Sequence, residues 1–256
     1  FVLLVVSLIF KALTNYVQIR FIHLSEFSIA KRLAEGYLKQ PYSWFLNRHS
    51  ADLGKTILSE VGIIIGNGIT PMIGLISKGL VTIALLTLLV VADPKLTLIV
   101  GLSLSISYLI IFYFIRNYLK RLGKIRFKNN QLRFTAISEA FGAAKEVKVG
   151  GLEQIYINRY SDPAKSFAKA QASSTIIAQL PRFFLEAIGF GGIILLILYL
   201  MKSSGSFNNA LPIISLYVFA GYRLLPALQQ IYVSFSQFTF VGPALDKLYN
   251  DIKSLK

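Results

Sequence analysis

The chain has 256 residues, of which 54% are hydrophobic and 15% are charged, and its formal net charge is +15. Soluble globular domains have about 25% charged residues and a smaller apolar share, so this composition excludes an ordinary soluble domain and indicates an integral membrane protein. The sequence has no cysteine, which excludes disulfides and thiolate metal sites.

The sequence predicts five long helices separated by proline, glycine or short polar turns. Pro41 ends the first helix because proline cannot continue a helical ladder, and Asp93-Pro94 ends the second. Residues 96–115 carry no charge and residues 61–92 carry only Lys78, so each run can cross about 30 Å of hydrocarbon as a helix. The soluble alternative, fully buried core helices, needs a very large protein around them. The predicted helices are residues 1–40, 51–92, 95–149, 153–201 and 209–256.

The third predicted helix is too long for a bilayer. At 1.5 Å per residue, the helix over residues 95–149 reaches about 80 Å, so half of it must leave the membrane. Its charged second half keeps a helical stripe of apolar residues, which predicts packing against other protruding helices. The stripe consists of Phe134, Ile137, Phe141 and Ala144.

The basic residues are distributed unevenly along the chain. Twelve of the 27 lysines and arginines fall between Arg116 and Lys169, whereas the turns near residues 92–96 and 201–209 contribute only Lys95 and Lys202. The positive-inside rule therefore places the protruding segments in the cytoplasm and the two turns outside. This topology explains the net charge, and no nucleic-acid partner is expected.

The tip of the protruding segment is expected at Gly150-Gly151, where glycine lets the chain reverse at a helix end. Leu152, Ile155 and Tyr156 then share one face of a short helix. Two interpretations of this apolar face remain open. It either caps the bundle of protruding helices or docks on a partner protein.

Three longer segments carry a family resemblance: "KRLAEGYLKQPYSWFLNRHSADLGKTILSEV", "ISEAFGAAKEVKVGGLEQIYINRY" and "YRLLPALQQIYVSFSQFTFVGPALDKLYNDI". In order and separation they resemble the two cytoplasmic loops and the last span of ABC exporters of the type I, or type IV, fold. The resemblance implies an all-α polytopic helical bundle in which residues 1–256 supply spans two to six of the six. It also implies two coupling segments that dock on nucleotide-binding domains, comprising Tyr42, Trp44 and Phe45 in the first and Leu152, Glu153, Gln154, Ile155 and Tyr156 in the second.

The parts of such a transporter that hydrolyse ATP are expected elsewhere. No G-x-x-x-x-G-K-[ST] phosphate loop occurs in the sequence, so ATP and Mg²⁺ are expected in an associated nucleotide-binding domain, fused after Lys256 or separate. The resemblance further implies a first span before Phe1, a second transmembrane domain in a homodimer or heterodimer, and a bacterial inner membrane. The full complex is expected to be an ATP-hydrolysing translocase.

Four ionisable residues lie inside predicted spans, where an unpaired charge is costly and indicates function. Lys78 and Arg223 lie 14 residues from the predicted outer turns, and Arg182 and Glu186 lie 19 and 15 residues from Met201. If all four face the lumen, they form a cationic cavity suited to phosphate or pyrophosphate. Alternatively, Arg182 reaches the inner interface and only pairs with Glu186, at i and i+4 on one helix face.

The sequence therefore predicts the membrane domain of an ATP-driven exporter or flippase for an amphipathic substrate with an anionic head, such as a lipid-linked saccharide. Its loops look like the oligosaccharide-lipid flippase branch of ABC exporters. A peptide or drug exporter of the same fold remains an alternative. An ion-coupled carrier or channel without an ATPase is another, although it predicts broken helices and paired acids along an ion route.

Overall fold

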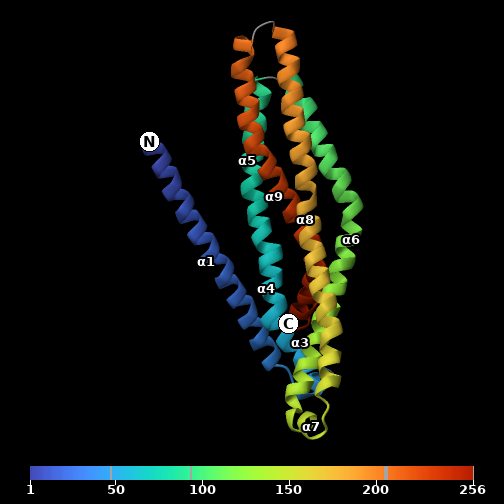
Figure 1. Ribbon diagram of the computed structural model, residues 1–256. Coiled ribbons are helices and arrows are strands. Elements are labelled where there is room, and N and C mark those ends of the chain that lie inside the picture. The colour runs from blue at the N-terminus through green and yellow to red at the C-terminus, as the bar shows by residue number, and fades with distance from the viewer. Residues whose placement is uncertain (47, 93, 205–206, 256) are drawn as a thin grey trace. The chain divides into compact units, whose positions relative to one another are not determined.

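The computed structural model describes residues 1–46, 48–92, 94–204 and 207–255, and within these ranges the chain is helical without strands (Figure 1). This confirms the predicted all-α class. The elements in chain order are α1 (Val2–Leu38), α2 (Tyr42–Leu46), α3 (Ser50–Lys55), the π-helical turn η1 (Thr56–Glu60), α4 (Val61–Ile64), the π-helical turn η2 (Ile65–Ile69), α5 (Thr70–Ala92), α6 (Pro94–Gly142), α7 (Ala144–Val149), α8 (Glu153–Ser204) and α9 (Phe207–Ser254).

The predicted second helix contains two π-helical turns, η1 and η2, that the sequence analysis did not foresee. The second of them directly precedes Thr70-Pro71. Pro71 has no amide hydrogen for the carbonyl four residues back, and the Thr70 hydroxyl donates to the Ile65 carbonyl at 3.1 Å. Prolines, π-bulges and side chains that enter the backbone ladder are each places where long helices depart from regular geometry, and all three occur together here.

The predicted third helix, residues 95–149, is wrong at its end, because the chain leaves the helical conformation at Ala143. Ala143 has φ −114° and ψ 38°, and it separates α6 from the short helix α7. The short helix at the tip is therefore Ala144–Val149, whereas Leu152 directly precedes the first turn of the 52-residue helix α8. The predicted outer turns include Asp93, Gly205 and Ser206, which lie outside the described residues.

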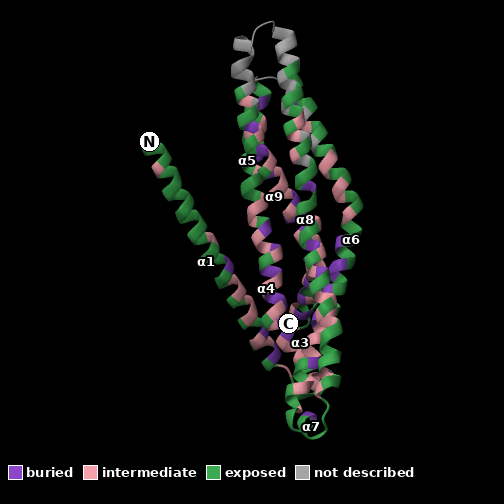
Figure 2. Ribbon diagram, in the orientation of Figure 1, coloured by how far each residue is buried: buried purple, intermediate pink, exposed green. Residues whose placement is uncertain are grey.

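Three segments of the described chain are long and apolar enough to cross a membrane by length and composition: Val2–Leu38, Ser50–Val91 and Thr97–Gly142. The spans that were also expected in residues 153–201 and 209–256 stay predictions. The first half of α1 is largely exposed (Figure 2), and its Phe1, Leu3 and Phe10 side chains are all mostly exposed. An apolar surface of this kind fits hydrocarbon better than water.

The chain divides into two compact units. Unit 1 comprises residues 1–70, 123–170 and 241–256. Its interior contains apolar residues such as Leu33, Val61 and Val241, but it also buries charged side chains. The Arg126 guanidinium lies 2.9 Å from a Glu60 carboxylate oxygen, and the Asn130 amide donates to the other oxygen at 2.5 Å. Since these three side chains are almost fully buried, the group joins η1 to α6 through a desolvated ion pair.

Unit 2 comprises residues 71–122 and 171–240, and its described interior is mainly apolar. Leu224 of α9 packs against Leu85 and Leu86 of α5, against Leu228 and against Tyr108 of α6. Aromatic rings extend this contact, with the Tyr108 and Tyr232 centroids 5.7 Å apart and Phe112 adjoining both Tyr232 and Phe235. Helices α5, α6 and α9 are thus held together by apolar packing, as is usual between helices inside a membrane.

Candidate functional site

A cavity of about 490 Å³ in unit 2 is lined by residues from α5, α8 and α9. The four ionisable residues predicted from the spans all line it: Lys78 from α5, Arg182 and Glu186 from α8, and Arg223 from α9. We call this space the cationic cavity. Its remaining walls are apolar or aromatic and consist of Val81, Phe190, Tyr222, Leu225, Pro226 and Ala227.

The charges of the cationic cavity do not cancel. The Arg182 Nε donates to Glu186 Oε1 at 2.6 Å, as the i,i+4 spacing predicted, and both side chains stay partly exposed. Within the described residues neither Lys78 nor Arg223 takes part in an ion pair, although the Arg223 guanidinium lies 5.9 Å from the Phe219 ring. Three cations therefore face one carboxylate, and the cavity has an excess of positive charge for an anionic group.

The first predicted coupling segment forms the five-residue helix α2, which has no buried residue. Tyr42 is 78% exposed and Leu46 is 68% exposed. Trp44 instead packs within the chain, with its ring 5.5 Å from Tyr37 and with the Arg48 guanidinium 4.1 Å above it. Phe45 contacts the edge of Trp44 at 5.2 Å. The outward face of this segment therefore includes Tyr42 and Leu46, and Leu46 was not among the anchors that the sequence predicted.

The turn at the tip uses its two glycines in different ways. Gly151 has φ +63°, in the left-handed region that strongly favours glycine, and the Leu152 amide donates to the Val147 carbonyl at 2.9 Å. This is the long bond of a Schellman motif, which ends a helix and redirects the chain. Gly150 is right-handed, but a Cβ there would lie 3.0 Å from the Glu146 carbonyl oxygen and 3.2 Å from Leu152.

The second predicted coupling segment is largely uncovered. Ile155 is 56% exposed and Leu152 is 37% exposed, so unit 1 does not cover these two side chains. Gln154 is also exposed and donates to Asn158 on the same helix at 3.0 Å. Tyr156 turns the other way, because it helps to line an apolar groove of about 290 Å³ formed by the end of α6, α7 and the start of α8.

Glu153 stabilises the beginning of α8. Its carboxylate accepts hydrogen bonds from its own backbone amide and from Lys148 at 3.0 Å, and these contacts lower the pKa of Glu153 below its usual value. A negative charge in the first turn also favours a helix N-terminus. Glu153 thus forms an exposed ion pair within the tip, and Leu152, Gln154 and Ile155 beside it are exposed as well; the docking role of these residues stays a prediction.

Sequence reasoning missed the residues that hold the helices of unit 1 together. Asp251 of α9 is almost fully buried and accepts from the Tyr37 hydroxyl at 3.2 Å, although the two residues are 214 positions apart. Glu60 and Arg126 were likewise unremarked. For each of these residues the signal available in the sequence was a charge at a position of a helix that faces other helices, and such a signal does not identify the partner.

The comparison with protein families gives one clear result. A family model described as "ABC transporter transmembrane region" matches residues 1–223, which is well over half of the chain. The matched range contains both predicted coupling segments and all four ionisable residues of the cationic cavity.

Proposed function

Because this chain belongs to the ABC transporter transmembrane family, we propose that it forms the substrate path of an ATP-driven exporter or flippase and couples that path to ATP hydrolysis. In this proposal two such domains form a dimer in the bacterial inner membrane, with the tip of unit 1 in the cytoplasm. ATP and Mg²⁺ bind to the associated nucleotide-binding domains, whose closure on ATP provides the driving force. The chain itself supplies rigid helices that convert the closure into a change of the cavity.

The observation that carries the substrate class is the composition of the cationic cavity. Lys78, Arg182 and Arg223 face only one carboxylate, Glu186, among the described lining residues. Arginine binds phosphate oxygens in a bidentate manner, and lysine acts as a mobile point charge for the same group. The aromatic and aliphatic walls, including Phe190 and Tyr222, fit an apolar chain or a sugar face. We therefore propose an amphipathic anionic lipid, such as a polyprenyl-pyrophosphate-linked saccharide, as the substrate.

The exposure of the cytoplasmic segments supports the coupling role. Tyr42 and Leu46 of α2, and Leu152 and Ile155 at the tip, are apolar side chains that unit 1 leaves uncovered. Apolar anchors of this kind dominate the energy of most protein interfaces when they enter a groove of the partner. We propose nucleotide-binding domains as that partner for both segments.

The test uses the complete transporter in proteoliposomes with an ATPase assay and a lipid-flipping assay run in parallel. Lys78→Ala and Arg223→Ala are each expected to reduce flipping of a pyrophosphate-linked lipid by about tenfold, which is the effect of losing ~1.4 kcal/mol of charge-assisted binding. ATP hydrolysis is expected to continue in both variants.

A matched control is Lys11→Ala, because Lys11 is exposed on the apolar helix α1 and does not line the cavity. Unchanged flipping in both cavity variants would remove the anionic-substrate proposal. Stimulation of ATP hydrolysis by peptides or drugs, without stimulation by the anionic lipid, would favour a peptide or drug exporter instead.

A further inference from the structure

The carboxylate of Asp251 is the meeting point of three segments of unit 1. Its oxygens accept from the Tyr37 hydroxyl of α1 at 3.2 Å and lie 3.1 Å from the Lys247 ammonium of α9. The Arg48 guanidinium, just after α2, lies 3.7 Å away. The Asp251 side chain is only 6% exposed, whereas Arg48 and Lys247 are 30% and 38% exposed, so water and salt screen these contacts less than they screen a surface ion pair.

The contacts form a closed circuit with Trp44. Arg48 reaches Asp251 with one nitrogen while its guanidinium plane lies over the Trp44 ring at 4.1 Å. The Trp44 ring packs on Tyr37 at 5.5 Å, and the Tyr37 hydroxyl returns to Asp251. Side chains from α1, α2, the following loop and α9 thus hold one another in place.

The helix α2 depends on this circuit for its position. It has five residues and no buried side chain, and a helix of that length has no stability of its own in water. The aromatic and cation–π contacts that tie the described residues of α2 to the rest of unit 1 run through Trp44 to Tyr37 and Arg48. Loss of the Asp251 charge releases Arg48 and leaves the Trp44 ring without one of its two supports.

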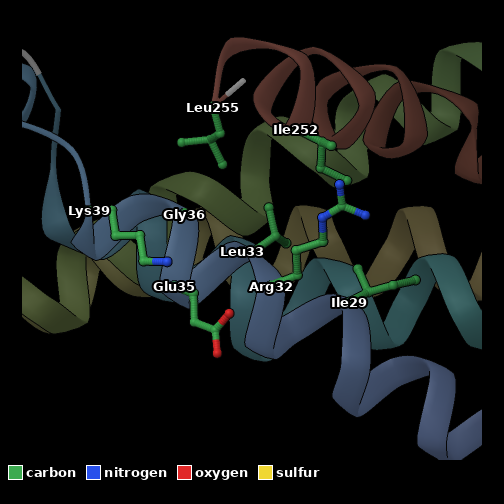
Figure 3. A pocket seen from close by; sticks show the side chains of 8 residues that line it. All are labelled: Ile29, Arg32, Leu33, Glu35, Gly36, Lys39, Ile252 and Leu255. Atoms are coloured by element: carbon green, nitrogen blue, oxygen red, sulfur yellow. The ribbon is translucent and has the colours of Figure 1, made fainter.

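A close backbone contact reinforces the joint between α1 and α9 (Figure 3). The Leu255 side chain faces Gly36, and a Cβ at Gly36 would lie only 2.9 Å from Leu255 Cδ1. The two residues line a cleft of about 250 Å³ together with Arg32 of α1 and Ile252 of α9. The end of α9 therefore lies against α1 on two consecutive turns, at Gly36 through apolar atoms and at Tyr37 through Asp251.

We infer that Asp251 is a positioning residue that fixes the docking face of α2 against the cytoplasmic end of α9. The inference rests on the proposed function, in which α2 docks on a nucleotide-binding domain. Helix α9 also carries Arg223 of the cationic cavity. Through Asp251, the helix α2, which would receive the movement of the nucleotide-binding domain, is held against α9, the helix that also carries Arg223 of the cationic cavity.

The first measurement tests positioning without any use of transport. Spin labels are placed on the complete transporter at Tyr42→Cys and Tyr249→Cys in a background without other cysteines, because both residues are exposed and this chain has no native cysteine. Asp251→Asn and Arg48→Gln are each expected to broaden the label distance distribution. The double variant is expected to broaden the distribution by less than the sum of the two single variants, because both substitutions break the Arg48–Asp251 contact.

The matched control is Glu35→Gln, which removes a nearby carboxylate whose partner, Lys31, lies on the same helix. It is expected to leave the distance distribution narrow. Tyr37→Phe removes only the hydroxyl donor and keeps the ring under Trp44, so it provides a milder variant if Asp251→Asn folds poorly. A distribution that is unchanged in Asp251→Asn, Arg48→Gln and Tyr37→Phe would overturn the inference.

The second measurement is the number of substrate molecules transported per ATP hydrolysed. A lost hydrogen bond to a charged group shifts a local equilibrium by about tenfold, so Asp251→Asn is expected to lower this ratio severalfold, whereas Glu35→Gln leaves it unchanged. If the label distances broaden but the number of substrate molecules transported per ATP stays normal, the positioning of α2 by Asp251 would stand and the proposed docking role of α2 would be overturned. The two failures are therefore distinguishable.

Discussion

The two units of the chain both have exposed ion pairs, but among the described residues they differ in the buried pairs that join separate helices. In unit 1, Glu60, Arg126 and Asp251 are buried and paired across different helices. In unit 2, Arg182 and Glu186 pair on the same helix, and both remain partly exposed at the edge of a cavity. Buried pairs between helices fix the positions of those helices, whereas exposed cations in excess of their acids remain available to a ligand. The charges of unit 1 are thus arranged to hold helices in fixed positions, and those of unit 2 are arranged to bind a ligand.

The largest expected difference between the units concerns stability. Glu60→Gln removes the carboxylate that lies 2.9 Å from the buried Arg126 guanidinium, and breaking a buried ion pair costs about 3 kcal/mol. Glu186→Gln breaks a pair at 2.6 Å whose two side chains are 53% and 38% exposed, so its cost is expected to stay below about 1 kcal/mol. Thermal unfolding of the purified transporter measures both. Equal shifts in melting temperature for Glu60→Gln and Glu186→Gln would contradict the difference between the buried pair of unit 1 and the exposed pair of unit 2.

A smaller effect concerns the cationic cavity, where the two members of one ion pair are expected to change the apparent KM for an anionic lipid in opposite directions. Arg182→Gln is expected to raise the apparent KM for an anionic lipid by about fivefold, the effect of ~1 kcal/mol. Glu186→Gln is expected to lower it, because the variant removes the single described carboxylate of the cavity and releases Arg182. Transport at graded substrate concentrations measures the two constants. A loss of affinity in both variants would assign the pair a structural role only.

The smallest expected effect compares one glycine from each unit. Gly151→Ala places a side chain at φ +63° and is expected to destabilise unit 1 by about 1 kcal/mol. Gly191 lies inside α8 with open space around it, so Gly191→Ala is expected to stabilise the protein by up to about 1 kcal/mol through helix propensity. Melting temperatures of the two variants should therefore move in opposite directions. A gain from Gly151→Ala would contradict the turn described at the tip.

The sequence was sufficient for the features that depend on local chemistry. Pro41 separates α1 from α2, and Gly151 adopts the left-handed conformation at the predicted reversal. Residue counts from the outer turns placed Lys78 and Arg223 at similar depths, and both side chains line one cavity. These features could be predicted because helix rise and turn chemistry are set within a few residues.

The features that the sequence did not predict depend on exact helix ends and on side-chain contacts between separate helices. The break at Ala143 directly follows Gly142, but a single glycine is also tolerated inside a helix, so this local signal does not by itself place a break. Glu60 and Arg126 are 66 residues apart, and a helical period shows only which face a residue occupies. Trp44 as an anchor for a partner stays a prediction, and its contacts with Tyr37 and Arg48 were not foreseen because they cross the break between α1 and α2 and the end of α2.

The claim on which the account depends is that the tip of unit 1 engages a nucleotide-binding domain. The direct test is a photocrosslinking amino acid at Ile155 in the complete transporter, with the same group at Lys128, an exposed position elsewhere on unit 1, as the control. The account predicts an efficient crosslink from position 155 to the nucleotide-binding domain and none from position 128. A tip that crosslinks only to lipid, or no better than position 128, would contradict it.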